Sequence, residues 1–72
     1  MSDYDTIMNM LEIRGIKFTT DWNKEAILNN DVRLVRWITI RSLNYIDKKI
    51  NLIEFKFSAN GELELVTALP DC

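Results

Sequence analysis

Few side chains in this sequence could do chemistry, because histidine is absent. Histidine is the commonest general base and the commonest transition-metal ligand in proteins. Without it no imidazole can activate the candidate nucleophiles, which are Ser2, Ser42, Ser58 and Cys72. A lysine acting as base on a serine stays open, although no motif marks such a pair. We therefore expect a protein that is not an enzyme, with no catalytic residue, no metal site and no cofactor.

Two pairs of acidic residues are the remaining candidates for a cation site. Asp3 and Asp5 stand near the start of a predicted helix, where carboxylates stabilise the positive end of the helix dipole. Glu62 and Glu64 alternate along a predicted strand and would share one face. The register favoured below sets Lys56 opposite Glu64, as on a solvated face with an ion pair. We interpret both pairs as structural.

Basic residues are concentrated in the middle of a chain whose net charge is −2. The segment 32–49 carries five basic residues and one acidic residue, whereas the segments on either side of it are acidic. Arginines beside aromatic residues can hold phosphates and stack bases, so nucleic-acid binding is one hypothesis. Its residues would be Arg33, Arg36, Arg41, Tyr45, Lys48 and Lys49. The overall acidity argues against it, because affinity for nucleic acid depends on neutralising phosphates.

The elements that must position these residues begin with an N-terminal helix. Ser2 or Asp3 can cap its start, and Gly15 after Arg14 is a typical left-handed stop. One buried stripe is indicated by the i, i+3, i+4, i+7 spacing of Tyr4, Ile7, Met8 and Leu11.

The strands follow the helix. We expect strands over 16–22 and about 32–42, with Ile38 and Ile40 facing inward and Trp37 facing outward. Residues 23–31 fit either a short helix or an irregular segment, with a turn at Asn29-Asn30-Asp31 before the second strand. A connection then runs over 43–49, and Pro70 is expected to end the final strand.

The segment 53–67 predicts a β-hairpin, because two alternating runs flank Asn60-Gly61. A two-residue turn pairs Phe57 with Glu64 and Phe55 with Val66. A three-residue loop (Ala59, Asn60, Gly61) instead gives the pairs Phe57–Leu63, Phe55–Leu65 and Lys56–Glu64. We favour the loop, because opposed residues share a face and these pairs match in character. Gly61 then takes the left-handed position of a bulge.

These elements predict a single small α+β domain over 1–72, with one N-terminal helix packed on a four-stranded, mostly antiparallel sheet in meander order. No apolar run approaches the ~20 residues that cross a bilayer, and the acidic N-terminus is unlike a secretory signal. We therefore expect a cytoplasmic protein without a membrane partner.

The sheet face away from the helix is the candidate binding surface. If Ile53, Phe55, Phe57, Leu63 and Leu65 face the helix, the opposite face carries Leu52, Val66, Ala68, Val35 and Trp37. An apolar centre with a charged rim is typical of interfaces. The candidate partner-binding residues are Arg33, Val35, Trp37, Arg41, Glu54 and Glu64. Two alternatives stay open, namely that Trp37 is a core residue and that the chain forms a homodimer through this face or a sheet edge.

The sequence EIRGIKF after the helix stripe, followed by FKFSANGELELV, resembles small orphan proteins of bacteriophages and mobile elements. The resemblance implies a non-enzymatic protein in the host cytoplasm that binds a host or defence protein, as anti-CRISPR inhibitors do. The acidic segments 1–31 and 50–72 would then mimic phosphate. A phage-encoded stoichiometric inhibitor is thus the leading hypothesis. The alternatives are a small nucleic-acid-binding protein using 33–49 and a homo-oligomeric structural or sequestering protein.

Overall fold

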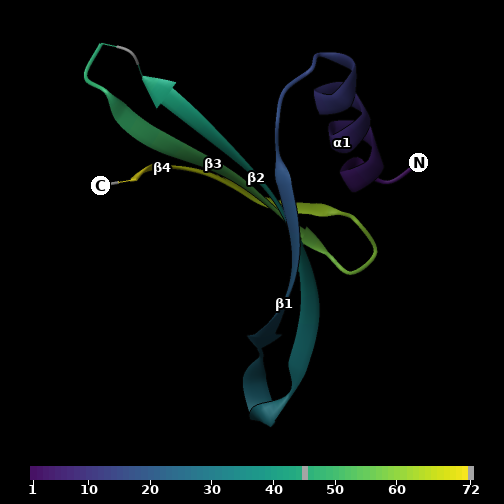
Figure 1. The fold of residues 1–72 in the computed structure, drawn as a ribbon. Coiled ribbons are helices and arrows are strands. Elements are labelled where there is room, and N and C mark those ends of the chain that lie inside the picture. Colours follow the sequence, from purple (N-terminus) through teal and green to yellow (C-terminus); the bar gives the residue numbers. More distant parts are fainter. Residues whose placement is uncertain (45, 72) are drawn as a thin grey trace.

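The computed structural model describes residues 1–44 and 46–71 (Figure 1). The elements are helix α1 (Asp3–Ile13), strand β1 (Thr19–Ala26), the short 3-10 turn η1 (Leu28–Asn30) and strands β2 (Val32–Asn44), β3 (Lys49–Ser58) and β4 (Leu63–Asp71). The four strands pair antiparallel in the order β1-β2-β3-β4. The predicted α+β fold and its meander order are confirmed. Across the described residues, no helix has the length and apolar character needed to span a membrane.

Helix α1 begins and ends where the sequence predicts. The Ser2 hydroxyl accepts a hydrogen bond from the Asp5 backbone N–H (3.2 Å) and donates one to the Asp5 carboxylate (3.0 Å), a reciprocal cap. At the other end Gly15 has φ +69°, and the N–H of Ile16 donates to the Leu11 carbonyl (2.9 Å). This geometry satisfies carbonyl groups that the last turn would otherwise leave unpaired.

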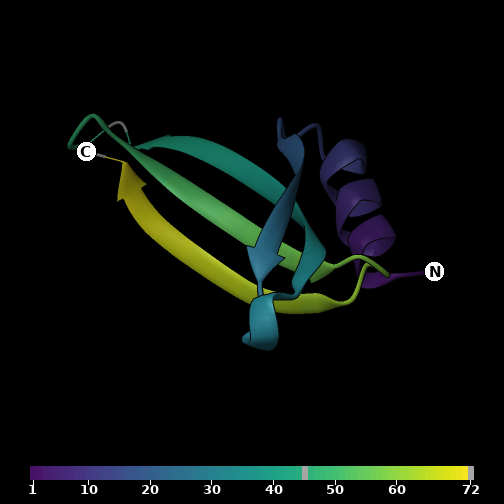
Figure 2. The ribbon, with the colours of Figure 1, turned by 90° about the horizontal axis from the view of Figure 1, so that it is seen from below.

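The start of α1 is fixed to the loop between β3 and β4, which lies beside it in Figures 1 and 2. The Tyr4 backbone N–H donates to the Gly61 carbonyl (2.9 Å). The Asp3 carboxylate accepts a hydrogen bond from the Leu63 backbone N–H (2.9 Å). Gly61 has φ +89°, and a Cβ atom there would lie 2.7 Å from the Ser2 hydroxyl oxygen. A side chain at Gly61 is therefore excluded by backbone conformation and by contact with the helix.

The core lies between α1 and one face of the sheet. Tyr4 and Leu11 from the helix are buried together with Ile38 of β2 and Phe57 of β3. The Tyr4 and Phe57 rings meet edge-on with centroids 5.2 Å apart, a favourable aromatic arrangement. Five partly buried residues pack around this group, namely Ile7, Met8, Phe18, Ile40 and Phe55. The predicted helix stripe and the inward orientation of Ile38 and Ile40 are confirmed.

Several strand boundaries differ from the expectation. Strand β1 starts at Thr19, three residues later than predicted, and continues into the ambiguous segment 23–31 as far as Ala26, before η1. The turn after it is confirmed, since Asn29 and Asn30 both have positive φ, which asparagine tolerates well. The connection after β2 is shorter than expected. Pro70 does not end β4 but pairs with Asn51 within it, which an edge strand allows.

The β3–β4 register combines the two alternatives that the sequence offered. Phe57 stands opposite Leu63, as the three-residue loop predicts, but Glu64 is then an extra residue in β4. Beyond this bulge Lys56 faces Leu65 and Phe55 faces Val66, so the predicted Phe55–Leu65 and Lys56–Glu64 pairs are wrong. Because a one-residue shift exchanges the faces of a strand, Leu65 turns away from the helix. Val66 turns toward the helix side.

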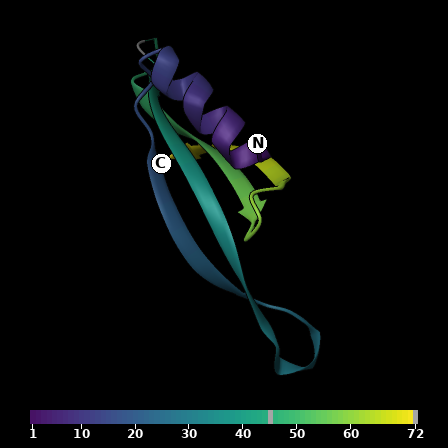
Figure 3. The ribbon, with the colours of Figure 1, turned by 90° about the vertical axis from the view of Figure 1, so that its right-hand side faces the viewer.

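The hairpin of β1 and β2 extends past the rest of the sheet (Figure 3). Val35 pairs with both Asn23 and Ser58, which is the last paired residue of β3 on this side. Beyond Val35, the strand residues of the segment 24–34, here called the arm, pair only with each other. The chain is long and flat, with Cα extents of 46 × 30 × 14 Å. Helix α1 covers one face of the sheet, and none of the described elements covers the opposite face, here called the outer face (Figure 2).

Candidate protein-binding face

Trp37 lies in the middle of the outer face, as predicted, and its side chain is partly buried. The register places Asp21 opposite it on β1 and Lys56 opposite it on β3. The Lys56 ammonium nitrogen is 5.9 Å from the centroid of the Trp37 ring, within the range of a cation–π contact. Trp37 is therefore a sheet-surface residue held between charged neighbours, and it is not part of the core under α1.

The apolar residues around Trp37 differ from the predicted set. The bulge at Glu64 moves Val66 and Ala68 to the helix side of β4, so their predicted place on the outer face is wrong. Leu65 and Leu69 occupy the outer face instead, with side chains 47% and 49% exposed. Together with the partly buried Leu52 of β3, they form what we call the leucine row.

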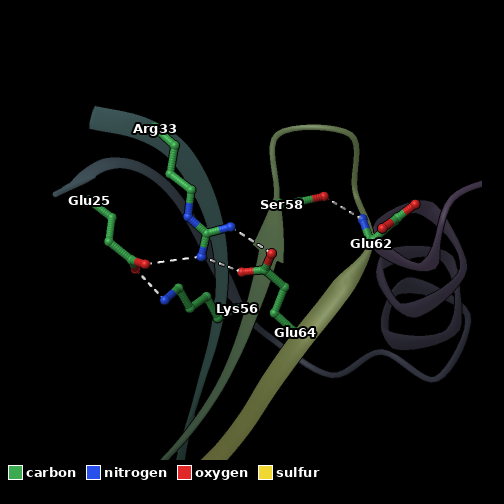
Figure 4. A network of polar contacts seen from close by, with 6 residues as sticks. All are labelled: Glu25, Arg33, Lys56, Ser58, Glu62 and Glu64. Carbon is green, nitrogen blue, oxygen red and sulfur yellow. Dashed lines mark hydrogen bonds and ion pairs between the residues drawn. The ribbon is translucent and has the colours of Figure 1, made fainter. Parts of the chain in front are cut away.

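Four charged side chains form a cluster at the base of the arm (Figure 4), and one of them, Lys56, stands opposite Trp37 in the ladder. The Arg33 guanidinium donates two hydrogen bonds to the Glu64 carboxylate, both 2.7 Å long. It also donates to Glu25 (3.0 Å), which forms an ion pair with Lys56. Each member comes from a different strand, so this charged cluster ties all four strands together. Glu64 reaches Arg33 because the bulge sets it outside the regular ladder.

These contacts shift the acid–base behaviour of the charged cluster. Hydrogen bonds from Lys56 and then Arg33 hold the pKa of Glu25 below its usual value. The hydrogen bonds from Arg33 likewise lower the pKa of Glu64. The two carboxylates in turn raise the pKa of the Arg33 guanidinium. All three groups therefore stay ionised at neutral pH, and the contacts among them persist wherever the carboxylates are charged.

The remaining predicted residues occupy different positions on the outer face. Val35 is only 1% exposed, although it belongs to the sheet face that has no covering element. Glu54 is partly buried and, with Trp37 and Asp21, lines an open hollow of about 510 Å³. Arg41 lies exposed farther along β2, opposite Leu52. Val35 is thus buried within this face, whereas Trp37, Glu54 and Arg41 are at least partly exposed on it.

The basic residues of the middle segment do not gather on one face. Arg33 and Arg41 belong to the outer face, whereas Arg36 lies on the helix side between two aromatic rings. Lys48 is in the turn before β3 and Lys49 begins that strand. Tyr45 lies outside the described residues. The strip therefore provides no continuous track of cations for a phosphate backbone.

The predicted acidic pairs have local partners. Asp3 and Asp5 bind the start of α1 and the β3–β4 loop, as described above. The Glu62 backbone N–H donates to the Ser58 hydroxyl (3.2 Å), and Figure 4 shows the Glu62 side chain apart from the Arg33–Glu64 contact. Over residues 1–44 and 46–71, no group of three or more acidic or cysteine side chains could hold a metal ion.

Sequence reasoning missed Glu25 and the two exposed leucines as members of this surface, and it placed Lys56 on the surface with the wrong partner in the ladder. Glu25 falls in the segment 23–31, whose pattern fits more than one structure and so does not predict a pairing with Arg33. The faces of Leu65 and Leu69 depend on the bulge at Glu64, which has no marker of its own in the sequence. The one available signal was the alternation of the polar residues Asp21, Asn23 and Glu25, which indicates that their face of β1 is not buried.

The comparisons with known proteins add no relative to this description. A search of family models, of curated proteins and of solved structures finds no match for this chain.

Proposed function

We propose that this chain is a non-catalytic protein-binding module that binds one partner stoichiometrically through its outer face. The observation that carries the proposal is an uncovered sheet face with Trp37 at its centre. Lys56 of the charged cluster lies between Trp37 and Leu65 of the leucine row, and the rest of the charged cluster lies toward the arm. Partly buried tryptophans surrounded by apolar and then charged residues are typical anchors of protein interfaces.

The accessible surface area of the chain supports the proposal that a partner covers part of it. The accessible surface is 5602 Å², whereas a compact monomer of 8.5 kDa would expose roughly 4,700 Å². The excess is on the order of the ~800 Å² that each protein contributes to a standard interface. A chain that presents a one-sided, flat sheet has the area that a partner can cover.

The outer face is better suited to protein than to nucleic acid. Arg33 and Lys56, two of its cations, already contact carboxylates of the same chain. Asp21 and Glu54 add negative charge beside Trp37. Nucleic-acid binding needs cations that are available to neutralise phosphates, whereas a protein partner can match both signs of charge. The acids beside Trp37 would meet basic side chains of the partner.

A more specific role follows from the resemblance to small proteins of bacteriophages and mobile elements. We propose on that ground that the partner is a host or defence protein and that binding inhibits it. Acidic side chains around an aromatic centre would suit a target surface that normally binds phosphate, because such surfaces are rich in lysine and arginine.

The test uses two neighbouring residues of β4 that point to opposite faces. Leu65 is 47% exposed on the outer face, and Val66 is 51% exposed on the helix side. We expect Leu65→Lys to weaken capture of a stoichiometric partner from lysate of the source cells by tenfold or more. The matched change Val66→Lys should leave capture within twofold, because it adds the same charge to the other face. Pull-down with mass spectrometry measures both, and circular dichroism confirms that each variant is folded.

Two outcomes would contradict the proposal. Equal capture by both variants would show that the outer face does not bind the partner. Loss of capture by Val66→Lys alone would assign binding to the helix side instead. As a further check, Trp37→Phe keeps an aromatic ring in place and should weaken binding less than Trp37→Ala does.

A further inference from the structure

The arm has a second uncovered surface, on the side of the sheet that carries α1. The helix lies over the other part of the sheet, and the arm projects past its N-terminal end (Figure 3). The register places Lys24 and Ala26 of β1 and Val32 and Leu34 of β2 on this side of the arm, with Trp22 and Arg36 on the same side at its base. We call these six residues the arm face. An isolated two-stranded hairpin is only marginally stable in water, so uncovered apolar residues on it call for an explanation.

The arm face is apolar to an unusual degree for a projecting hairpin. Trp22, Val32 and Leu34 are 54%, 62% and 47% exposed on it. Ile27 and Leu28 extend the exposed apolar surface around the tip. Single exposed apolar residues are ordinary, but a contiguous group on a protruding element marks an interaction site.

Arg36 is held at the base of this face in a fixed position. Its guanidinium carbon lies 3.5 Å from the centroid of the Tyr4 ring and 4.6 Å from that of Trp22. The two aromatic rings thus stabilise the cation, while its Nε atom is buried without a hydrogen-bond partner. Within the described part of the chain no carboxylate forms an ion pair with Arg36, whereas Arg33 on the other face contacts two.

The charges of the arm are divided between its two faces. Lys24 of the arm and Arg36 at its base lie on the arm face, whereas Glu25 and Arg33 of the arm lie on the outer face, where they contact each other. Asp31 follows the turn at the tip. The arm face therefore combines apolar side chains with two cations and no carboxylate. Arg36 is already oriented by its stacking, so a carboxylate could bind it with little loss of side-chain entropy.

We propose that the arm face binds an apolar, acidic segment of a partner protein. Its aromatic or aliphatic side chains would pack on Trp22 and Leu34, and its Asp or Glu carboxylate would accept hydrogen bonds from Arg36 and Lys24. Charge complementarity selects this occupant over a second copy of the chain, because two copies joined through this face would bring like cations together. The arm face lies on the opposite side of the sheet from Trp37, although Lys24 and Ala26 also line the hollow beside Trp37.

The proposal is tested with a phage-displayed library of random 12-residue peptides selected on the immobilised protein. We expect the enriched peptides to combine aromatic or aliphatic residues with Asp or Glu. Lys24→Glu should weaken their binding at least tenfold, because it puts a carboxylate where the peptide places one. Lys17→Glu makes the same change of net charge before β1 and should leave binding within twofold.

Nuclear magnetic resonance then assigns the surface, because the chain has only two tryptophans. An enriched acidic peptide should shift the indole N–H signal of Trp22 and leave that of Trp37 in place. A shift of Trp37 alone would locate binding on the outer face and overturn this proposal while supporting the one above. A shift of the Trp22 signal alone would support the arm-face proposal. It would not bear on the outer face, which the pull-down of Leu65→Lys and Val66→Lys tests separately.

Four further results would overturn the arm-face proposal. They are a selection that enriches no sequence, enrichment of peptides without carboxylates, unchanged binding by Lys24→Glu, and preferential binding of a thymidine oligonucleotide. Sedimentation that shows a dimer of wild-type chains, reduced to monomers by Lys24→Glu, would also overturn it by making a second copy the occupant.

Discussion

The two glycines provide a sharp test of how the helix is fixed to the sheet. Gly15 and Gly61 both have positive φ, +69° and +89°, so replacing either with alanine strains the backbone by roughly 1–2 kcal/mol. A Cβ atom at Gly15 would have nothing within 4 Å, whereas one at Gly61 would lie 2.7 and 2.8 Å from two Ser2 atoms. The difference between the two variants therefore measures the contact between the loop and the helix.

The loss of stability expected for Gly61→Ala depends on which contacts must move to relieve the clash between the new Cβ atom and Ser2. Shifting the start of α1 weakens the Ser2 cap, worth about 1 kcal/mol, and the hydrogen bond from Tyr4 to Gly61, worth about 1 kcal/mol more. Added to the backbone strain, the loss is roughly 3–4 kcal/mol, against roughly 1–2 kcal/mol for Gly15→Ala. A domain of this size has a free energy of unfolding of roughly 4–11 kcal/mol, so the difference is easily measured.

Urea unfolding followed by tryptophan fluorescence is the assay, and a double-mutant cycle refines it. Ser2→Gly removes both clashing atoms and by itself costs only a few tenths of a kcal/mol. In that background we expect Gly61→Ala to cost about 2 kcal/mol, the remainder being strain and the Tyr4 Cβ contact at 3.3 Å. Equal losses for Gly15→Ala and Gly61→Ala, or strict additivity with Ser2→Gly, would refute the reasoning.

Three other predictions concern the sheet. The pKa values of Glu25 and Glu64 are lower in the folded than in the unfolded chain, so the free energy of unfolding should fall as pH drops below about 4.5. The double variant Glu25→Gln/Glu64→Gln should lose less stability over the same pH range, and urea midpoints measured across pH test both statements. Val35→Ala should lower the free energy of unfolding by about 2 kcal/mol and Val66→Ala by under about 0.5 kcal/mol; similar losses would mean that Val35 is not buried. Arg36→Lys keeps the charge but not the planar stack, so it should destabilise the chain by about 1 kcal/mol and alter Trp22 fluorescence; an unchanged urea midpoint would count against the stack.

The parts of the fold that were predictable depend on neighbours in sequence. The helix cap at Ser2, its stop at Gly15 and the loop ending at Gly61 each involve contacts within a few residues. The burial of Ile38 follows from alternation along a single strand. In each case the local pattern and the tertiary structure agree, which is the condition for reading one from the other.

The parts that were not predictable depend on residues far apart in the chain. The sequence offered two registers for the β3–β4 hairpin, and Phe57 follows one while Phe55 follows the other. The contact that accompanies this change joins Glu64 to Arg33, and Arg33 lies in the arm. The arm could not be predicted because the hydrophobic residues of 23–31 follow neither the period of a strand nor that of a helix. The apolar composition of the outer face could not be predicted without both features.

The bulge at Glu64 has a consequence for how such a surface can change over generations. Deleting that single codon would remove the extra residue, while Phe57 keeps Leu63, Lys56 keeps Leu65 and Phe55 keeps Val66 as its partner. Every other residue of β4 would stay on its present face, and only the carboxylate that contacts Arg33 would be lost. A lineage could thus gain or lose the link between β4 and the arm in one step, without changing which leucines are exposed.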